Sequence, residues 1–161
     1  MIKLDQTDMK ILGALRRDGR MTKLRLAEAV NLSPTACWER LRRLERARVI
    51  VGYSVRIDRE KIGRENTVLV EVTLKSHTKA DFDRFEAAIR EQPEVVACDA
   101  TGGGLDYLLR VVTRDVPSYQ AFMESLLTRD LGIDRYFSYI VTKQVKDVEP
   151  ALNGPTDGDR P

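Results

Sequence analysis

The sequence predicts an α+β protein with two domains. Residues 1–59 are expected to form a winged helix-turn-helix domain with its connector, and residues 60–148 a ferredoxin-like β-α-β-β-α-β domain. Two observations predict this. Apolar residues recur at helical spacing through the first 46 residues, and strand-like and helix-like segments alternate after residue 65. The polar, turn-rich residues 149–161 are expected to be a disordered tail.

The composition is that of a globular protein. A chain of 161 residues with 42% hydrophobic and 32% charged residues can form two small domains. No apolar run approaches the roughly 18 residues of a membrane span, and the N-terminus lacks a signal-peptide core. We therefore expect a cytoplasmic protein that does not contact membranes. Cys37 and Cys98 lie in apolar surroundings and are expected to be buried free thiols.

Charge is distributed unevenly along the chain. Residues 1–60 hold 14 Lys/Arg and 8 Asp/Glu, a formal charge of +6, whereas the remainder carries −4. A basic first third suggests that this part alone meets a polyanion such as DNA. The alternative is a chance fluctuation in composition.

The first helix is expected over residues 4–19. Asp5 can cap it, and Asp8 places negative charge in its first turn, where the helix dipole favours it. Gly19 can adopt the left-handed conformation that ends a helix. The inward stripe is Ile11, Leu12 and Leu15.

A second short helix is expected over residues 23–30. Thr22 is suited to cap it, and Asn31 tolerates the positive φ of a tight turn. Ser33 then caps a third helix, with Pro34 at its first position, where the missing N–H costs nothing. Two short helices joined by such a turn form a helix-turn-helix, whose second helix enters the major groove of DNA.

The third helix has an apolar side and a basic side. At about 100° per residue, Cys37, Leu41 and Leu44 share one face. The candidate DNA-binding residues are Thr22, Ser33, Thr35, Glu39, Arg40, Arg42 and Arg43. Arginine can hydrogen-bond to guanine or to a phosphate, threonine can contact a thymine methyl, and glutamate can accept from cytosine. The N-terminal amides of a helix can bind a phosphate. The alternative is a solvated amphipathic helix. Trp38 either packs against the neighbouring helix or projects toward the DNA backbone.

The rest of the chain alternates between strands and helices. Residues 49–58 suggest a small ribbon or wing followed by an extended connector. Strands are expected over 66–75, 95–101, 106–114 and 133–146, and helices over 80–92 and 117–128. This order gives two split β-α-β halves, the ferredoxin-like topology.

A glycine run before a carboxylate is a candidate small-molecule site. Bare backbone amides can approach a ligand carboxylate closely, and an aspartate can receive an ammonium group, as a zwitterion requires. The candidate effector-binding residues are Gly102, Gly103, Gly104 and Asp106, with Tyr139 and Thr142 from the last strand. The alternative is a strand-to-strand hairpin whose glycines only satisfy backbone geometry.

No pattern in the sequence indicates catalysis or a cofactor. His77, the single histidine, lies in a polar turn and is expected to be a solvated loop residue. No His/Cys/Asp cluster has metal-ligand spacing, and no nucleophile has an evident base partner. We therefore expect no metal and no cofactor.

Together these segments resemble the Lrp/AsnC family of transcription regulators. The matching pieces are Leu4-Asp5, Asp8, Ile11-Leu12, Leu15, Gly19-Arg20, Leu26-Ala27, Val30 to Pro34, Arg40, Arg43 to Glu45, Val49-Ile50, Gly52-Tyr53 and Gly103 to Val111. The resemblance covers residues 2–148. It implies a regulator that binds double-stranded operator DNA, and a C-terminal RAM domain that senses an amino acid or related metabolite. It also implies control of amino-acid-related metabolism and homodimers, which in this family often assemble to octamers.

The hypothesis that follows couples the effector to DNA through assembly. Paired sheet domains would place two recognition helices on a roughly palindromic site, about one helical turn apart. An effector near Gly103 and Asp106 would favour one assembly over another. The alternative is a small-molecule enzyme on a dimeric ferredoxin-like domain, with the N-terminal helices as an oligomerisation arm.

Overall fold

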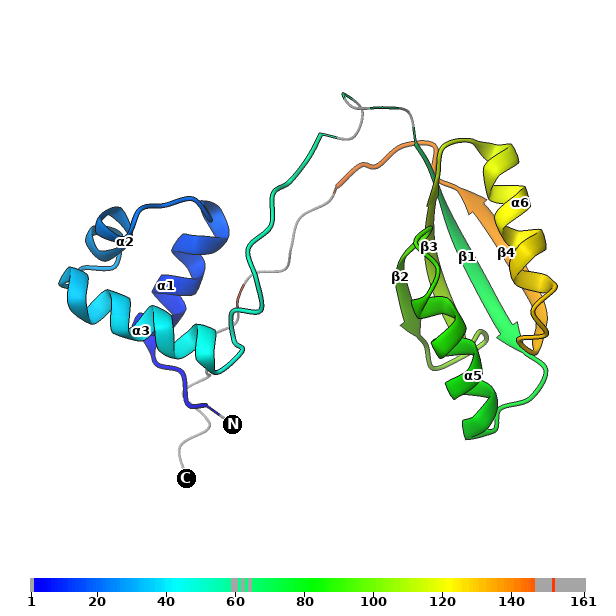
Figure 1. The fold of residues 1–161 in the computed structure, drawn as a ribbon, viewed down its shortest axis with the longest axis horizontal. Helices are drawn as coiled ribbons and strands as arrows, with labels where there is room; N and C mark the ends of the chain where they lie inside the picture. The colour runs from blue at the N-terminus through cyan, green and yellow to red at the C-terminus, as the bar shows by residue number, and fades with distance from the viewer. Residues whose placement is uncertain (1, 59–60, 62, 64, 147–151, 153–161) are drawn as a thin grey trace. The chain divides into compact units, whose positions relative to one another are not determined.

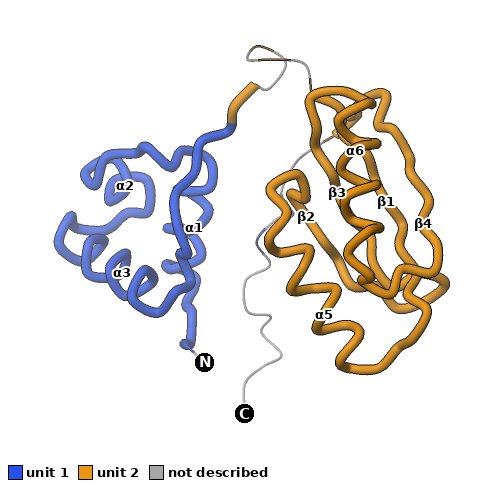
Figure 2. Tube along the Cα trace, turned by 45° about the vertical axis from the view of Figure 1, so that its right-hand side comes forward, with its two compact units in different colours: residues 1–56, 148–161 blue, residues 57–147 orange. Residues whose placement is uncertain are grey.

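The computed structural model describes residues 2–58, 61, 63, 65–146 and 152. The chain divides into two compact units, one containing Met1–Arg56 and the other Ile57–Asp147 (Figure 2). They are called unit 1 and unit 2 below, and each is described by itself. The tail expected from residue 149 lies outside the described residues, apart from Leu152.

Unit 1 contains three helices, α1 (Gln6–Arg17), α2 (Lys23–Ala29) and α3 (Pro34–Arg46) (Figure 1). All three predicted caps are confirmed. The side chains of Asp5, Thr22 and Ser33 accept hydrogen bonds from the backbone N–H groups of Asp8, Arg25 and Ala36, respectively. Each cap satisfies an amide that has no partner within its own helix.

The turns that end the helices were predicted in part. Asn31 has φ 57°, which confirms the left-handed residue between α2 and α3. The expectation for Gly19 is wrong, because Gly19 is not among the residues with positive φ. Instead α1 is closed by the extended residue Asp18, whose N–H donates to the carbonyl of Ala14. Arg48, just after α3, also has φ 57°, which the sequence did not indicate.

One apolar cluster holds the three helices together. Its buried members are Ile11, Ala14, Leu26, Ala27, Val30, Cys37, Leu41 and Leu44. Each fully buried leucine or isoleucine contributes about 1.5–3 kcal/mol relative to an exposed one. The inward face of α3 is therefore the predicted one, with Cys37, Leu41 and Leu44 buried.

The segment after α3 differs from the predicted ribbon. Among the described residues from 47 to 58 no strand is paired. Alternate apolar side chains in this segment are exposed, namely Val51, Tyr53, Val55 and Ile57. The alternation typical of a strand is present, but no other segment of the described chain pairs with it. The Tyr53 hydroxyl ties this segment back to α3, since it donates to Glu45 at 2.9 Å.

Unit 2 has the predicted ferredoxin-like topology. Its elements in chain order are β1 (Asn66–Leu74), α5 (Lys79–Arg90), β2 (Val95–Ala100), β3 (Tyr107–Thr113), α6 (Val116–Leu127) and β4 (Ile133–Ile140). The four strands form one antiparallel sheet in the order β2-β3-β1-β4. Figure 1 shows α5 and α6 on the same face of this sheet.

The last strand is shorter than the sequence predicts. It ends at Ile140 rather than residue 146, and the N–H of Val141 donates to the carbonyl of Thr67 at 2.8 Å. Because β1 begins at Asn66, β4 has no neighbour to pair with beyond this point.

The two faces of the sheet differ. Val68, Val70 and Val72 of β1 are completely buried in the core beneath the helices. Side chains at the alternate positions point away from the helices. On this face the side chains of β1 are only partly buried. Those of β4 are exposed, with Phe137 at 53% and Tyr139 at 50%. The helix-free face of the sheet therefore carries exposed apolar side chains, alongside charged ones, that the described part of this unit leaves uncovered.

One of the two cysteines differs from its prediction. Cys37 is buried, as expected, whereas Cys98 on β2 is exposed. β2 is an edge strand with little cover, and most of its residues are exposed. None of the described helices is both long and apolar enough to cross a membrane.

Candidate nucleic-acid interface and effector site

The outer face of α3 presents a continuous polar stripe. Thr35, Glu39, Arg42 and Arg46 are all exposed, and their spacing of four, three and four residues places them along one side of the helix. We call these four residues the α3 stripe. Thr35, Glu39 and Arg42 were predicted as DNA contacts. Arg46 was not, although its helical spacing already places it on the same face.

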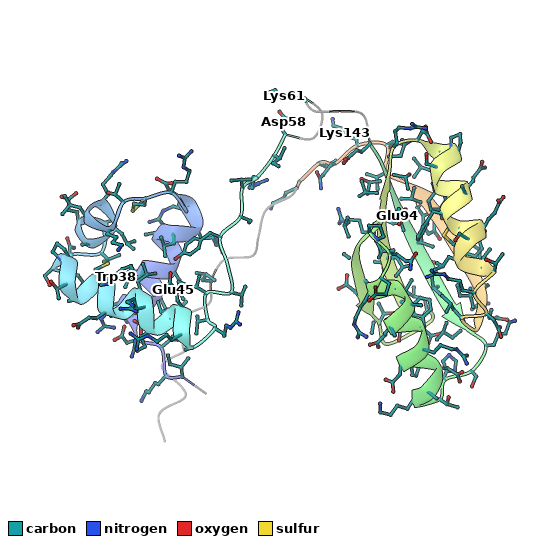
Figure 3. The ribbon with its side chains drawn as sticks, viewed as in Figure 1. Trp38, Glu45, Asp58, Lys61, Glu94 and Lys143 are labelled. Atoms are coloured by element: carbon teal, nitrogen blue, oxygen red, sulfur yellow. The ribbon has the colours of Figure 1, made fainter. Side chains whose placement is uncertain are left out.

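Trp38, labelled in Figure 3, lies beside this stripe. Cations from two helices lie close to its ring. The ammonium nitrogen of Lys23 lies 3.3 Å from the centre of the Trp38 ring, and the guanidinium carbon of Arg42 lies 5.8 Å from it. The indole also packs against the apolar cluster of unit 1. The packing interpretation of Trp38 is thus confirmed, whereas its approach to the DNA backbone stays a prediction. Lys23 was not predicted.

Arg40 and Arg43 differ from the α3 stripe in their partners, because both side chains reach carboxylates at the start of α1. The Nη1 atom of Arg40 lies 2.6 Å from Oδ2 of Asp5 and 2.9 Å from Oδ1 of Asp8. The Nη2 atom of Arg43 lies 2.5 Å from Oδ2 of Asp8. The Asp8 side chain is completely buried, whereas those of Arg40 and Arg43 are 32% and 47% exposed. The structure therefore pairs both of these predicted contacts with carboxylates at the start of α1.

The same carboxylates also cap α1. The N–H of Asp8 donates to Asp5 at 2.8 Å, and the N–H of Asp5 donates to Asp8 at 3.0 Å, which forms a reciprocal capping box. The backbone N–H of Asp8 and then the Arg40 guanidinium lower the pKa of Asp5. Hydrogen bonds that Arg40 donates to Asp5 and Asp8 raise the pKa of Arg40. Both shifts favour the charged forms of Asp5 and Arg40.

Thr22 and Ser33 lie at the exposed starts of α2 and α3. Their hydroxyl oxygens accept backbone N–H groups at 3.3 Å. Each hydroxyl can still donate its own proton to another acceptor, such as a phosphate oxygen.

The glycine run forms an exposed loop between β2 and β3. Added Cβ atoms at Gly102, Gly103 and Gly104 would meet no atom within 4 Å, and Gly103 has φ +143°. Two hydrogen bonds close the loop at its base. The Thr101 N–H donates to the carbonyl of Asp106 at 2.9 Å, and the Thr101 hydroxyl donates to the carbonyl of Leu105 at 2.7 Å. The glycines are open to a ligand, but Gly103 also meets a backbone requirement of the turn.

Asp106 has partners within the protein. Its Oδ2 accepts the N–H of Leu74 at 2.8 Å and lies 3.1 Å from Nε2 of His77. The Asp106 side chain is 17% exposed and that of His77 is 59% exposed. His77 was expected to be a solvated loop residue. It is exposed, but it also pairs with Asp106 and its ring centre lies 5.9 Å from that of Phe82.

The predicted effector residues fall into two separate groups. The Asp106 carboxylate accepts a hydrogen bond from Leu74, at the end of β1. Tyr139 instead pairs with Leu69, five residues earlier in the same strand. That separation is about 17 Å at the usual rise per residue. Thr142 lies further on, beyond the end of β4. Tyr139 itself donates to Glu71 at 3.3 Å. One chain therefore does not bring Tyr139 and Thr142 to the glycine loop.

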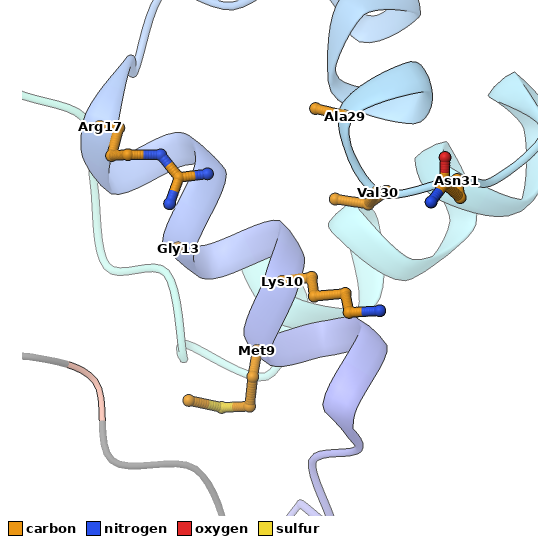
Figure 4. A pocket seen from close by; sticks show the side chains of 7 residues that line it. All are labelled: Met9, Lys10, Gly13, Arg17, Ala29, Val30 and Asn31. Carbon is orange, nitrogen blue, oxygen red and sulfur yellow. The ribbon is translucent and has the colours of Figure 1, made fainter.

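A shallow open depression of about 440 Å³ lies on unit 1, between α1 and the end of α2 (Figure 4). It is lined by Met9, Lys10, Gly13, Arg17, Ala29, Val30 and Asn31. None of the predicted effector residues lines it. Within the described residues, no group of three or more His, Cys, Asp or Glu side chains could hold a metal ion.

Comparisons with known proteins agree with this division of the chain. Residues 4–51 match a winged helix-turn-helix DNA-binding family, and residues 67–151 match the Lrp/AsnC ligand-binding domain. The transcriptional regulatory protein DoeX of Halomonas elongata is 50% identical over 90% of this chain and 92% of its own length. The leucine-responsive regulatory protein of Haemophilus influenzae is 36% identical over 89% of this chain and 86% of its own.

A solved structure is similar along nearly the whole chain. It is a transcriptional regulator of Neisseria meningitidis in complex with L-Met, with a TM-score of 0.84 and 32% identity. The alignment covers 94% of this chain and 97% of that one. The similarity therefore spans both units.

Proposed function

The chain belongs to the Lrp/AsnC family of transcription regulators, and from that premise we propose that its α3 stripe reads an operator sequence while unit 2 responds to an amino acid or a derivative of one. The observation that carries the DNA part is the exposed stripe of Thr35, Glu39, Arg42 and Arg46 beside the cation-flanked Trp38. A protein that binds chromosomal DNA would act in the cytoplasm.

The side chains of the stripe suit base edges in a major groove. The exposed guanidinium of Arg42 can bind guanine O6 and N7 together, Glu39 can accept from the cytosine amino group, and Thr35 can contact a thymine methyl. Thr22 and Ser33, at the starts of their helices, would lie beside phosphates. Phosphate contacts set the position of the protein, and the stripe supplies the sequence preference.

Arg40 and Arg43 take a different role in this proposal from the one their sequence position predicts. Their guanidiniums are bound to Asp5 and Asp8, so their primary effect is to hold α3 against α1. An arginine has five N–H donors, so each keeps some unused, but the positive charge of each is already paired with a carboxylate.

The effector is proposed to bind at the loop of Gly102, Gly103 and Gly104 beside Asp106. The open glycine amides suit a carboxylate, and the partly exposed Asp106 suits an ammonium group. The N. meningitidis relative was solved with L-Met, which has both groups. Tyr139 and Thr142 would reach an effector only from a second subunit, since they lie far from this loop in their own chain.

A homodimer is proposed through the helix-free face of the sheet. Leu69, Phe137 and Tyr139 give this face an apolar surface that the chain leaves uncovered. Pairing two such faces would hide this apolar area from water and place two α3 helices on one DNA site. Larger assemblies, up to the octamer, would follow from contacts between dimers.

The proposal is tested by selecting bound duplexes from a random-sequence pool with the purified protein, followed by affinity measurements with each of the twenty amino acids. We expect an enriched motif with two-fold symmetry, and a change in its affinity of at least five-fold with one or more amino acids. A pool without enrichment would contradict the DNA part. Binding that no amino acid alters would contradict the effector part.

A further inference from the structure

Asp8 connects the start of α1 to two arginines of α3. Its side chain is completely buried, with one carboxylate oxygen 2.9 Å from Arg40 and the other 2.5 Å from Arg43. Asp5 completes the group from the surface, 2.6 Å from Arg40. Half of the arginines in α3 are therefore paired with carboxylates of another helix.

This pairing changes the charge that α3 offers to DNA. Four arginines and two glutamates give α3 a formal charge of +2, and Asp5 and Asp8 cancel it. Non-specific affinity for DNA depends on how many phosphates a protein neutralises, because each neutralised phosphate releases counterions. A guanidinium already paired with a carboxylate neutralises a phosphate less completely.

We propose that Asp8 is a positioning residue for DNA specificity: it withholds Arg40 and Arg43 from phosphates, so that non-specific binding stays weak and the α3 stripe decides where the protein binds. This inference rests on the proposed DNA-binding face of α3. Asp8 touches no DNA in this account and acts only through the two arginines.

Holding α1 against α3 does not by itself require a carboxylate at this position. The two helices already share a core in which Ile11, Ala14, Leu41 and Leu44 are buried. A buried ion pair must recover a large desolvation cost, and an apolar group of similar size often stabilises a protein as well or better. What a neutral residue could not do at this position is lower the effective charge of two arginines that are 32% and 47% exposed.

The test compares the wild-type full chain with Asp8→Asn on a labelled duplex of arbitrary sequence, over a range of salt concentrations. The variant is expected to bind this duplex more tightly at low salt than the wild type does. With one or two more phosphates neutralised, it should also lose about 3- to 12-fold more affinity than the wild type between 50 and 200 mM salt. On a duplex carrying the selected motif, its preference over arbitrary DNA should fall.

Two further variants separate this role from a structural one. Asp8→Asn combined with Arg43→Gln should lose part of the added salt dependence, because one of the released cations is gone. Asp5→Asn keeps a good helix cap and leaves the ion pair of Arg43 with Asp8 in place. Its increase in non-specific DNA affinity and salt dependence should therefore be smaller than that of Asp8→Asn. Circular dichroism and Trp38 fluorescence show whether Asp8→Asn folds. If it does not, Asp5→Asn carries the test, and its affinity for the arbitrary duplex should still fall more steeply with salt than that of the wild type.

The outcomes are distinct. A folded Asp8→Asn protein with the wild-type salt slope, or with weaker non-specific binding, would overturn the inference. The inference would also be overturned if Asp8→Asn combined with Arg43→Gln kept all of the salt dependence that Asp8→Asn adds. Failure of the proposed function would appear already in the wild-type protein, as an absence of duplex binding, whereas failure of this inference appears only in the difference between wild type and variants.

Discussion

The ammonium group of Lys23 lies 3.3 Å from the centre of the Trp38 ring, so that a cation of α2 covers the indole of α3. Trp38 is the single tryptophan of the chain. Its fluorescence therefore reports on the one surface to which we assign DNA binding.

Replacing Lys23 with alanine tests this surface. The contact contributes about 0.5–1 kcal/mol at an exposed site, so the unit should stay folded while the Trp38 emission shifts. Affinity for any duplex should fall, and the salt slope should decrease by about one. Salt-dependent binding checks this, with Lys75→Ala in unit 2 as the control for loss of one positive charge. Equal slopes in Lys23→Ala and wild type would remove Lys23 from the interface.

Arg42 and Arg43 are neighbours in sequence with different surroundings. Arg43→Ala should lower the free energy of unfolding of unit 1 by about 1–3 kcal/mol, because buried Asp8 loses a charged partner. Arg42→Ala should change that free energy by no more than about 0.5 kcal/mol, since Arg42 lies on the surface. Urea unfolding followed by Trp38 fluorescence measures both. Equal stabilities for the two variants would contradict the assignment of Arg43 to the Asp8 pair.

The effector site is tested at Asp106. Asp106→Asn keeps an acceptor for the buried N–H of Leu74 but removes the negative charge, so the effector response should be lost while stability is retained. Asp106→Ala should lose the effector response as well. Because it leaves the Leu74 N–H unpaired, it should also lower the free energy of unfolding by about 1–3 kcal/mol. DNA binding without effector should persist in both. A full effector response in Asp106→Asn would exclude the carboxylate as a contact for the effector ammonium group.

The helix-free sheet face is tested by Phe137→Asp. Phe137 is 53% exposed in the single chain, so the unit should fold, whereas burying a new charge in the paired face should dissociate the dimer. Leu127→Asp, at another exposed apolar position on α6, serves as the matched control. Light scattering should give a monomer for the first variant and the wild-type mass for the second. A Phe137→Asp protein of wild-type mass would move the interface elsewhere.

The stability of unit 1 should fall in acid partly through Asp5. The backbone N–H of Asp8 and the side chain of Arg40 hold the pKa of Asp5 below its unfolded value of 3.8. Its stabilising contribution is therefore full above that value and disappears as the pH falls through the lower, folded pKa. Asp5→Asn should flatten this part of the pH dependence. Urea unfolding at stepped acidic pH, monitored by Trp38, measures the change, and Asp83→Asn in unit 2 should leave it unaltered.

Local features were predicted from the sequence more successfully than distant contacts. Asp5, Thr22 and Ser33 cap helices through bonds to residues three positions away, so the chemistry of a short segment determines them. The inward face of α3 follows from helical spacing alone. The topology of unit 2 follows from the order of its apolar segments, and the ferredoxin-like prediction is confirmed.

Pairings between distant segments could not be predicted in the same way. Asp8 was assigned only to the helix dipole, because its arginine partners lie 32 and 35 residues away. The end of β4 depends on where β1 begins, and the exposure of Cys98 depends on β2 being an edge strand. The pairing of His77 with Asp106 joins two loops 29 residues apart. Nothing near these residues in sequence indicates the partner.

The most direct test of the central claim is the base preference of Arg42→Ala. Duplexes selected from a random pool by this variant should resemble the wild-type motif but lose the preference for guanine at one position in each half-site. Discrimination there should fall by about 1–3 kcal/mol. If the variant selects the wild-type motif with unchanged discrimination at every position, the α3 stripe does not read the operator through Arg42, and the proposed recognition face is wrong.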